Sequence, residues 1–544
     1  MYDTVTHPPG PPINGLKFNT AGPSVSGKHY MLDPLARIHY QDIEELIVDE
    51  RYFILHAPRQ TGKTTALLAL MKYLNASGRY AAVYANIEGV QTARHDVARA
   101  MRSITHIIAD AAEDYLGETR LHDWRRSIWK NTGPDDVLRT LLRIWSSASA
   151  KPVILLLDEV DALVGDTLVS LLRQLRAGYA QRPEAFPQSV ILCGVRDVKD
   201  YRIQTSQEGI ITGGSAFNIK AESLTLGNFT QDECQALWLQ HTEATGQPFD
   251  PAIFPELWLD TWGQPWLVNA LAHELTWRHQ ALRDRSISVT LEHYHAAREV
   301  LIQSRATHLD QLTDKLKEPR VHRVIASLLE AEGQNTRLQD DDLQYVEDLG
   351  LIRRKPWLSI SNRIYQEVIP RTLSSNCQDG LAMVQAPYLT AERRINMPKL
   401  LASFQQFFRE HSEIWVERFD YREAAPQLIL QAYLQRIING GGRIHREYGL
   451  GMRRTDLAIE WAVDEAQGYW GPVQRIVLEL KIQRGSWDSI LAEGLPQVVD
   501  YARRWGADEA HLLIFNRQPE ISWEQKIRHC EVMHEDVMVQ VWGA

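Results

Sequence analysis

A glycine-containing loop directly after an apolar segment constrains this chain more than any other feature. Residues 52–57 read YFILHA, and residues 57–65 read APRQTGKTT. An apolar strand, such a loop and a helix that begins at the lysine form a cradle of inward-pointing backbone N–H groups. The N-terminus of the helix adds partial positive charge to this cradle. We therefore expect an α/β fold with a phosphate-binding site at the loop.

The loop residues have distinct expected roles. Lys63 would reach the β- and γ-phosphates of a nucleotide, and the hydroxyl of Thr64 would hold Mg²⁺. Gly62 stands before the lysine, where a side chain would crowd the phosphates. Ala57 replaces the usual first glycine, so the strict motif is not met, and a chance GKT in a turn is the alternative. The other residues expected to bind the nucleotide here are Pro58, Arg59, Gln60, Thr61 and Thr65.

A second apolar segment, VILLLDEVD at 153–161, ends in acidic residues. Asp158 at the end of this strand would complete the Mg²⁺ shell. Glu159 would polarise the attacking water as a general base. Arg196 follows the apolar run 189–195 and is expected on the γ-phosphate side, with an ordinary surface arginine as the alternative.

Strand-like and helix-like segments alternate through this part of the chain. Apolar runs at 52–57, 80–87, 153–161 and 189–195 are separated by segments of helical spacing at 63–76, 94–116 and 134–148. Strands connected by crossover helices form a parallel sheet covered on both faces. The expected fold class is therefore α/β.

These motifs, together with FNIKAESLTLGNFT and TWGQPWLVNAL, resemble the AAA-like P-loop ATPases of the STAND type over residues 29–375. The resemblance implies ATP-driven conformational switching, often with self-assembly into a homo-oligomer. It also implies a Gly-x-Pro turn that approaches the nucleotide from a helical domain. Gly263, Gln264 and Pro265 match this turn.

At 544 residues the chain is too long for one hydrophobic core, so several domains are expected. A Pro-, Gly- and Ser-rich leader at 1–28 is expected to be flexible or extended. The ATPase core at 29–227 is followed by a helical domain at 228–317. Two helices and a hairpin at 318–375 predict a winged-helix unit, which binds DNA in many proteins but in NTPases often serves only as a lid or packing arm. A linker at 376–398 and a C-terminal α/β domain at 399–544 complete the chain.

The C-terminal domain carries a second group of polar residues on apparent strands. Asp456 lies in RRTDLAIEW, and Glu479 and Lys481 lie in IVLELKI. Period-two alternation puts Glu479 and Lys481 on one face of their strand. Carboxylates on adjacent strands can share a divalent cation, and a lysine can position water and stabilise phosphate charge. The alternative is a solvated ion pair across two strands.

This pattern resembles the PD-(D/E)XK nuclease superfamily, in which restriction-endonuclease-like domains use Mg²⁺ or Mn²⁺. Asp456 and Glu479 would then be metal ligands and, with Lys481, catalytic residues. Gln497 and Tyr501, one helical turn apart, resemble the DNA-facing helix of the RecB-like branch. Glu423 is a candidate for the outer metal shell, and the candidates for DNA backbone contact are Arg443, Arg446, Arg453 and Arg454.

Net charge, hydropathy and cysteine spacing limit the expected partners and location of the protein. The net charge of −10 gives no global attraction to nucleic acid, so DNA contact requires local basic patches. The sequence contains no uncharged apolar run of about 18 residues, so no membrane span is expected, and no secretory signal is visible. The widely spaced Cys193, Cys234, Cys377 and Cys530 are typical of reduced thiols in a cytoplasmic protein.

Three functions follow as hypotheses. The first is an ATPase coupled to metal-dependent cleavage of nucleic acid, with DNA as the expected partner. The second is a regulatory ATPase switch whose C-terminal domain only binds DNA or a partner. The third is a DNA-stimulated motor or loader.

Overall fold

The computed structural model divides into two compact units, Met1–Ser304 with Asp348–Gly350, and Arg305–Glu347 with Leu351–Ala544. The residues that it describes are 15–196, 202–204, 210–212, 220–303, 315–329, 338–369, 388–418, 429–431, 433–434, 442–450, 453–464, 471–483, 485–516, 518 and 520–544. No helix among them is long and apolar enough to span a membrane.

A parallel sheet forms the centre of the first unit. Its order is β2-β3-β4-β1-β7, and every neighbouring pair is parallel. The strands are β1 (Tyr52–His56), β2 (Ala81–Asn86), β3 (Val153–Asp158), β4 (Ser189–Gly194) and β7 (Lys220–Thr225). Strands β1 to β4 confirm the four apolar runs of the sequence. Strand β7 was not among those runs because KAESLT mixes charged, polar and apolar residues.

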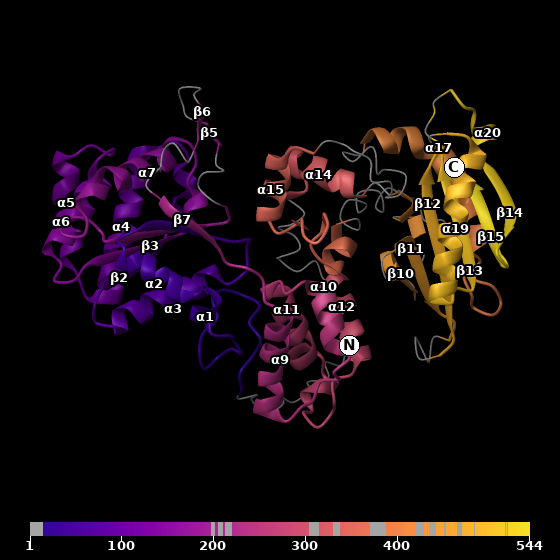
Figure 1. The fold of residues 1–544 in the computed structure, drawn as a ribbon, viewed down its shortest axis with the longest axis horizontal. Helices are drawn as coiled ribbons and strands as arrows, with labels where there is room; N and C mark the ends of the chain where they lie inside the picture. The colour runs from indigo at the N-terminus through magenta and orange to yellow at the C-terminus, as the bar shows by residue number, and fades with distance from the viewer. Residues whose placement is uncertain are drawn as a thin grey trace, which may run out of the picture. The chain divides into compact units, whose positions relative to one another are not determined.

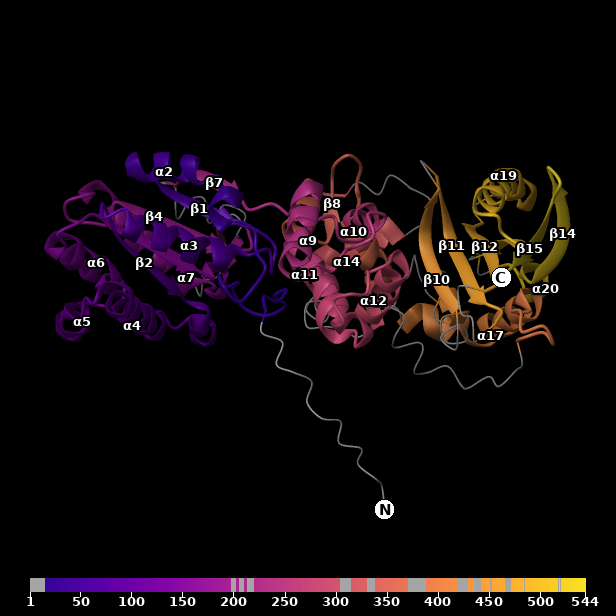
Figure 2. The ribbon, with the colours of Figure 1, turned by 90° about the horizontal axis from the view of Figure 1, so that it is seen from below.

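Helices cover both faces of this sheet (Figures 1 and 2). On one face, α2 (Tyr40–Val48) and α3 (Lys63–Ala76) pack against alternate strand residues. On the other lie α4 (Val97–Leu116), α5 (Arg120–Asn131), α6 (Val137–Ala148) and α7 (Asp166–Gly178). α5 and α7 were not predicted, whereas α3, α4 and α6 correspond to the expected helical segments. The α/β class is confirmed for this unit.

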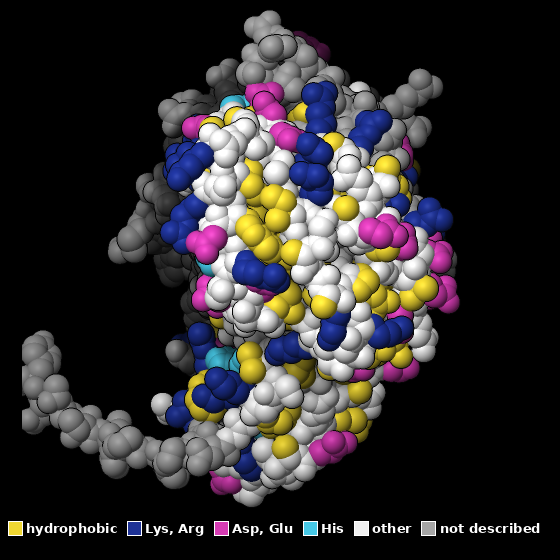
Figure 3. Space-filling model, turned by 90° about the vertical axis from the view of Figure 1, so that its left-hand side faces the viewer, with side chains coloured by type: hydrophobic (Ala, Val, Ile, Leu, Met, Phe, Trp, Pro, Cys, Tyr) yellow, Lys and Arg dark blue, Asp and Glu magenta, His cyan; other side chains and the backbone are white. Residues whose placement is uncertain are grey.

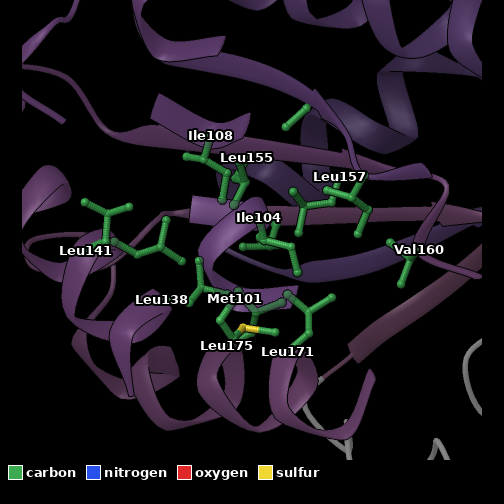
Figure 4. Close-up of a cluster of buried hydrophobic side chains, with 14 of the residues drawn as sticks. Met101, Ile104, Ile108, Leu138, Leu141, Leu155, Leu157, Val160, Leu171 and Leu175 are labelled. Carbon is green, nitrogen blue, oxygen red and sulfur yellow. The ribbon is translucent and has the colours of Figure 1, made fainter. Parts of the chain in front are cut away.

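The side chains of α4 show why this layer is stable. Met101, Ile104 and Ile108 follow the i, i+3, i+7 spacing of one helical face, and all are fully buried. Figure 4 shows this row pointing toward β3 and toward the apolar faces of α6 and α7. The opposite face of α4 is left exposed.

Helices replace strands after β7, as expected. The extension consists of α9 (Gln231–Thr245), α10 (Ile253–Thr261), α11 (Pro265–His273) with a π-helical continuation at Glu274–Arg278, and α12 (Leu291–Gln303). α9 begins with a capping box, in which Thr230 accepts from the Glu233 backbone and the Glu233 carboxylate accepts from the Thr230 backbone.

The described part of the leader, residues 15–28, is mostly exposed but is held to the rest of the first unit at a few points. Phe18 is 2% exposed and lies against the rings of Tyr30 and Trp238. A bridge pairs Lys17 with His29. The expectation of a flexible or extended leader stays a prediction. Two aromatic side chains of α9, Trp238 and His241, offer Phe18 and Tyr30 a buried site that composition does not reveal.

The second unit begins with short elements. α14 (Pro319–Leu329) and α15 (Asp340–Asp348) are followed by a hairpin of β8 (Ile352–Arg353) and β9 (Ser359–Ile360). This is the helix, helix and hairpin order expected for residues 318–375.

A six-stranded mixed sheet of order β10-β11-β12-β13-β15-β14 forms the rest of the second unit. Its strands are β10 (Gly442–Leu450), β11 (Arg453–Ala462), β12 (Val473–Ile482), β13 (Glu509–Phe515), β14 (Arg528–His534) and β15 (Val537–Gly543). α17 (Met397–Arg418) precedes the sheet, and α19 (Trp487–Trp505) connects β12 to the parallel β13. β10 and β14, which are edge strands, were not predicted.

Candidate functional site

The loop between β1 and α3 has the backbone that phosphate binding requires. Gly62 has φ +97°, and a Cβ there would lie 3.0 Å from the Arg37 guanidinium. Glycine is therefore needed for its backbone conformation as well as for space. Thr61 donates to the Pro58 carbonyl at 2.8 Å, which tightens the turn. α3 begins at Lys63 with no side-chain cap, so its first N–H groups face the loop.

Lys63 lies inside this loop. The side chain is 5% exposed, and its Nζ donates to the carbonyls of Ala57 at 2.9 Å and Pro58 at 3.0 Å. These bonds hold the ammonium group over the turn, where the motif predicts phosphate oxygens.

Thr64 and Asp158 meet as the sequence predicts. The Thr64 hydroxyl donates to Asp158 Oδ2 at 2.8 Å, although β4 lies between β3 and β1 in the sheet. Asp158 is fully buried and also accepts from the Tyr84 hydroxyl at 2.9 Å and from the Glu159 backbone at 2.9 Å. Burial and the Asp158 charge raise the pKa of Tyr84, so this hydroxyl remains a donor.

Glu159 follows in a left-handed conformation, with φ +59°, that is uncommon for a residue other than glycine. Burial raises the pKa of its carboxyl, and the nearby Lys63 opposes the shift. A carboxylate with a raised pKa beside a phosphate loop suits a general base. The structure thus brings Lys63, Thr64, Asp158 and Glu159 into one site.

Arg196 lies in a separate pocket from these four residues. It lines a small pocket beyond the end of β4, together with Asp161, Val160 and Leu168. Asp161 in turn accepts from the Val195 backbone at 3.1 Å. None of the loop residues 57–65 lines this pocket, so a γ-phosphate role for Arg196 remains a prediction.

A larger cavity, of about 120 Å³, opens beside the phosphate loop. Gln60, Thr61, Gly62 and Thr65 form one wall. The leader and the start of α11 contribute to the other walls through Asn19, Thr20, Ala21, Gly22, Ser24, Pro265, Trp266 and Asn269. Two hydrogen bonds tie these walls together: the Ser24 backbone donates to Thr65 Oγ1 at 3.0 Å, and Trp266 Nε1 donates to the Thr20 carbonyl at 2.9 Å.

The position of the Gly-x-Pro turn beside this cavity depends on the backbone conformation of Gly263. Gly263 has φ +67°, and a Cβ there would lie 1.9 Å from the Phe229 carbonyl. The Gln264 side chain caps α11 by accepting from the Leu267 backbone at 2.6 Å. Pro265 occupies the first turn of that helix, where its missing N–H costs nothing. The turn thereby joins the helical extension to the loop region.

Arg37, on the short helix α1 (Pro34–Arg37), is a site residue that sequence analysis missed. Its guanidinium donates to the carbonyls of Thr61 at 3.0 Å and Gly227 at 2.8 Å and lies over the Phe229 ring. Burial lowers its pKa to about 10, so the group stays charged near neutral pH. No motif marks Arg37 or Tyr84, since both reach the site only through the fold.

In the second unit, Glu479 and Lys481 lie on one face of β12. Both side chains are 5% exposed, and Lys481 Nζ lies 3.6 Å from Glu479 Oε1. The same Nζ donates to Glu493 Oε1 of α19 at 3.3 Å. Lys481 thus lies between the buried Glu479 and Glu493, whose side chain is 51% exposed, so the group is buried on the sheet side and open to solvent at α19. Glu493 was not predicted, although it stands one turn before Gln497.

The position of Asp456 on β11 follows from the pairing of β11 with β12. β11 and β12 are antiparallel, with Leu457 against Leu478. Asp456 precedes Leu457 on β11 and Glu479 follows Leu478 on β12, so each directly adjoins this pair along the chain. Arg453 and Arg454 lie earlier in β11, opposite Leu450 and Gly449. Glu423 lies outside the described residues.

Gln497 and Tyr501, the pair predicted to face DNA, lie on α19, the helix after β12. Gln497 and Tyr501 follow Glu493 at intervals of four residues on α19, so the three share one face. This face is the one from which Glu493 reaches Lys481. Gln497 is half-buried and Tyr501 is buried.

A comparison with known protein families found a match within the first unit. A family model described as Nephrocystin 3, N-terminal, matches residues 35–185, which include the phosphate loop and Asp158. Together with the geometry above, this match supports a P-loop ATPase core. No curated protein matches the chain.

Several solved structures are similar to part of the chain. The Walker-type ATPase of Pyrococcus abyssi is 12% identical with a TM-score of 0.41, covering 65% of this chain and 99% of that one. Cdc6p from Pyrobaculum aerophilum is 15% identical with a TM-score of 0.35, covering 66% and 98%. The RuvB Holliday junction branch migration motor of Thermotoga maritima is 10% identical with a TM-score of 0.32, covering 61% and 92%.

Proposed function

We propose that the first unit binds and hydrolyses ATP and that this activity controls metal-dependent cleavage of DNA by the C-terminal domain. The observation that carries the ATPase proposal is the bond between Thr64 and Asp158, with Glu159 directly after it. A hydroxyl and a carboxylate at hydrogen-bond distance form the hard oxygen ligand set that Mg²⁺ prefers. Mg²⁺ would neutralise charge on the phosphates, while Lys63 would contact their oxygens.

Glu159 would accept a proton from the attacking water. Arg37, through its bond to the Thr61 carbonyl, would hold the phosphate loop in place. The cavity between the leader and α11 is a place for the nucleoside, with Pro265 and Trp266 on one side of it. Because this cavity is built from the leader, the loop and the extension, nucleotide binding would change how the three are held together.

The nuclease proposal rests on the group formed by Glu479, Lys481 and Glu493. Glu479, with Asp456 on the neighbouring strand β11, would offer carboxylates for Mg²⁺ or Mn²⁺. The metal would activate water and stabilise charge on the scissile phosphate. Lys481, held between two carboxylates, would donate to a phosphate oxygen or to the water. Gln497 lies on the same face of α19 and would contact the DNA, whereas the buried Tyr501 would support this face from within.

The first experiment measures cleavage of linear, circular and single-stranded DNA with Mg²⁺ or Mn²⁺, with and without ATP. Loss of cutting in Lys481→Ala, with normal cutting in the exposed Lys399→Ala control, is the expected result. Loss of the ATP effect in Lys63→Ala would show that the first unit controls the second. ATP hydrolysis by a wild-type chain that cuts no substrate would instead favour the regulatory switch. Strong stimulation of hydrolysis by DNA without cutting would favour the motor.

Self-assembly is the last part of the proposal. We expect the chain to form a homo-oligomer when ATP is bound. Sedimentation of the wild type and of Glu159→Gln in ATP and Mg²⁺ tests this, and a monomer under every nucleotide condition would contradict it.

A further inference from the structure

Histidine and carboxylate side chains gather where α4 and α5 meet, outside both sites described above. Among the described residues, His106, Asp110 and His122 are the one group of such side chains close enough to share a metal ion, with ligand atoms within 4.8 Å of one another. We propose that this group, the α4–α5 site, binds Zn²⁺.

The two helices bring these residues together for simple geometric reasons. α4 buries Met101, Ile104 and Ile108, so the i, i+4 pair His106 and Asp110 lies on its exposed face. α4 ends at Gly117, whose φ of +67° terminates the helix. α5 then begins at Arg120 and places His122 in its first turn, beside the last turns of α4.

The separations are close to those of a tetrahedral site. His106 Nδ1 lies 3.2 Å from Asp110 Oδ1, and His122 Nε2 lies 3.8 Å from the same oxygen. Ligand atoms about 2.05 Å from a zinc ion are about 3.3 Å apart in a tetrahedron. All three ligand atoms lie within 4.8 Å of one another, so rotation of the partly exposed rings would have to bring them closer to complete the three-ligand set.

The kind of ligand selects the kind of ion. Two imidazoles and one carboxylate suit zinc, whereas Mg²⁺ and Ca²⁺ prefer oxygen ligands alone. Glu113 adds a fourth group, because its Oε2 lies 2.9 Å from His122 Nε2. Arg125 interacts with Asp110, and Arg102 and Arg126 lie near Arg125, so a bound cation would have to compete with arginines for these carboxylates.

The site is open to an ion from solvent. The side chains of His106 and Asp110 are 53% and 51% exposed, and His122 is 22% exposed. Figure 3 shows acidic and basic side chains interspersed over one end face of the chain, with few histidines among them. α5 buries only Leu121 and Ile128 among its residues, so a metal bridge to α4 would add stability where apolar packing is small.

The test compares zinc binding by the full chain with binding by His106→Asn/His122→Asn. Both proteins are stripped with a chelator and titrated with Zn²⁺ in excess Mg²⁺, against a chromophoric zinc indicator. We expect the double variant to lose one equivalent of tightly bound Zn²⁺. Asp110→Asn, which keeps the shape of the side chain, is expected to weaken that equivalent more than about tenfold.

His534→Asn removes a histidine of β14 outside the site and is the matched control, expected to bind as the wild type does. Zn²⁺ should raise the Tm of the wild type and of His534→Asn but not that of the double variant. Co²⁺ bound to the wild type should show the visible absorption of a four-coordinate ion, and the double variant should lack it. Equal zinc stoichiometry and affinity in the wild type and the double variant would overturn the proposal.

Discussion

The position, backbone conformation and raised pKa of Glu159 all bear on its proposed role as general base. It stands directly after the buried Asp158, in a left-handed backbone conformation, and burial raises the pKa of its carboxyl. A general base must be deprotonated to accept a proton. Hydrolysis is therefore expected to be lost as the pH falls through the raised pKa of Glu159, above the usual range of a glutamate.

Replacing Glu159 with Gln removes the base but keeps the size of the side chain. We expect ATP hydrolysis to fall by about 100-fold or more, while ATP binding persists because Lys63 and Thr64 are unchanged. Glu88→Gln, an exposed residue near the end of β2, should hydrolyse ATP normally. Steady-state hydrolysis and equilibrium nucleotide binding, measured from pH 5 to 9, check both parts. Undiminished hydrolysis in Glu159→Gln would exclude this residue as the base.

Lys481 and Glu493 allow a second comparison at the same scale. Lys481→Met removes the charge and keeps the stem, and DNA cleavage is expected to fall by about 100- to 1,000-fold. Glu493→Gln removes one of the two carboxylates near the ammonium and should reduce cleavage less, since Glu479 remains. Single-turnover cleavage rates measure both variants. A larger loss from Glu493→Gln than from Lys481→Met would assign the metal-binding role to Glu493.

At the scale of elements, the turn between α10 and α11 connects the helical extension to the phosphate loop. Its geometry depends on Gly263, since any side chain there would collide with the Phe229 carbonyl. The Phe229 backbone also donates to the Gly263 carbonyl at 2.8 Å. The start of α11 thus reaches the cavity only if this turn is intact.

Gly263→Ala is expected to destabilise the first unit by at least about 2 kcal/mol, through the positive φ and the backbone collision together. Nucleotide affinity should fall with it, because Pro265 and Trp266 would be displaced. Gly133→Ala is the control: nothing lies within 4 Å of its added Cβ, so its effect should stay within about 0.5 kcal/mol. Urea unfolding and nucleotide titration make the comparison, and equal stability of the two variants would contradict the argument.

The whole molecule consists of two compact units, and the nucleotide contacts described above all belong to the first. A ligand stabilises only the part of the protein that binds it. Calorimetry of the wild type is therefore expected to show at least two unfolding transitions. ATP with Mg²⁺ at about 100 times its Kd should stabilise one of them by about 2.7 kcal/mol.

Lys63→Ala identifies the transition that belongs to the first unit, because its Tm should no longer respond to ATP. Lys72→Ala, an exposed lysine of the same helix α3, should respond as the wild type does. A uniform shift of every transition by ATP would indicate that the two units unfold together, and would revise this description.

Local sequence was sufficient for much of the first unit. Strands β1 to β4 are continuous apolar runs buried on both faces, and such runs are visible without any tertiary information. The phosphate loop is also local, since Gly62, Lys63 and Thr64 are consecutive and their roles follow from the strand before them and the helix after them. In the second unit, alternation alone placed Glu479 and Lys481 on one face of β12.

Tertiary structure decided the contacts between separate elements that no sequence motif marks. Arg37 reaches Thr61, Phe18 reaches Trp238, and Glu493 reaches Lys481 only because helices and strands pack in a particular order. The leader is rich in Pro, Gly and Ser, which by composition favours flexibility, yet its described part forms a wall of the cavity. Composition and periodicity report how a residue relates to its neighbours in sequence, whereas burial by a distant surface depends on the packed fold.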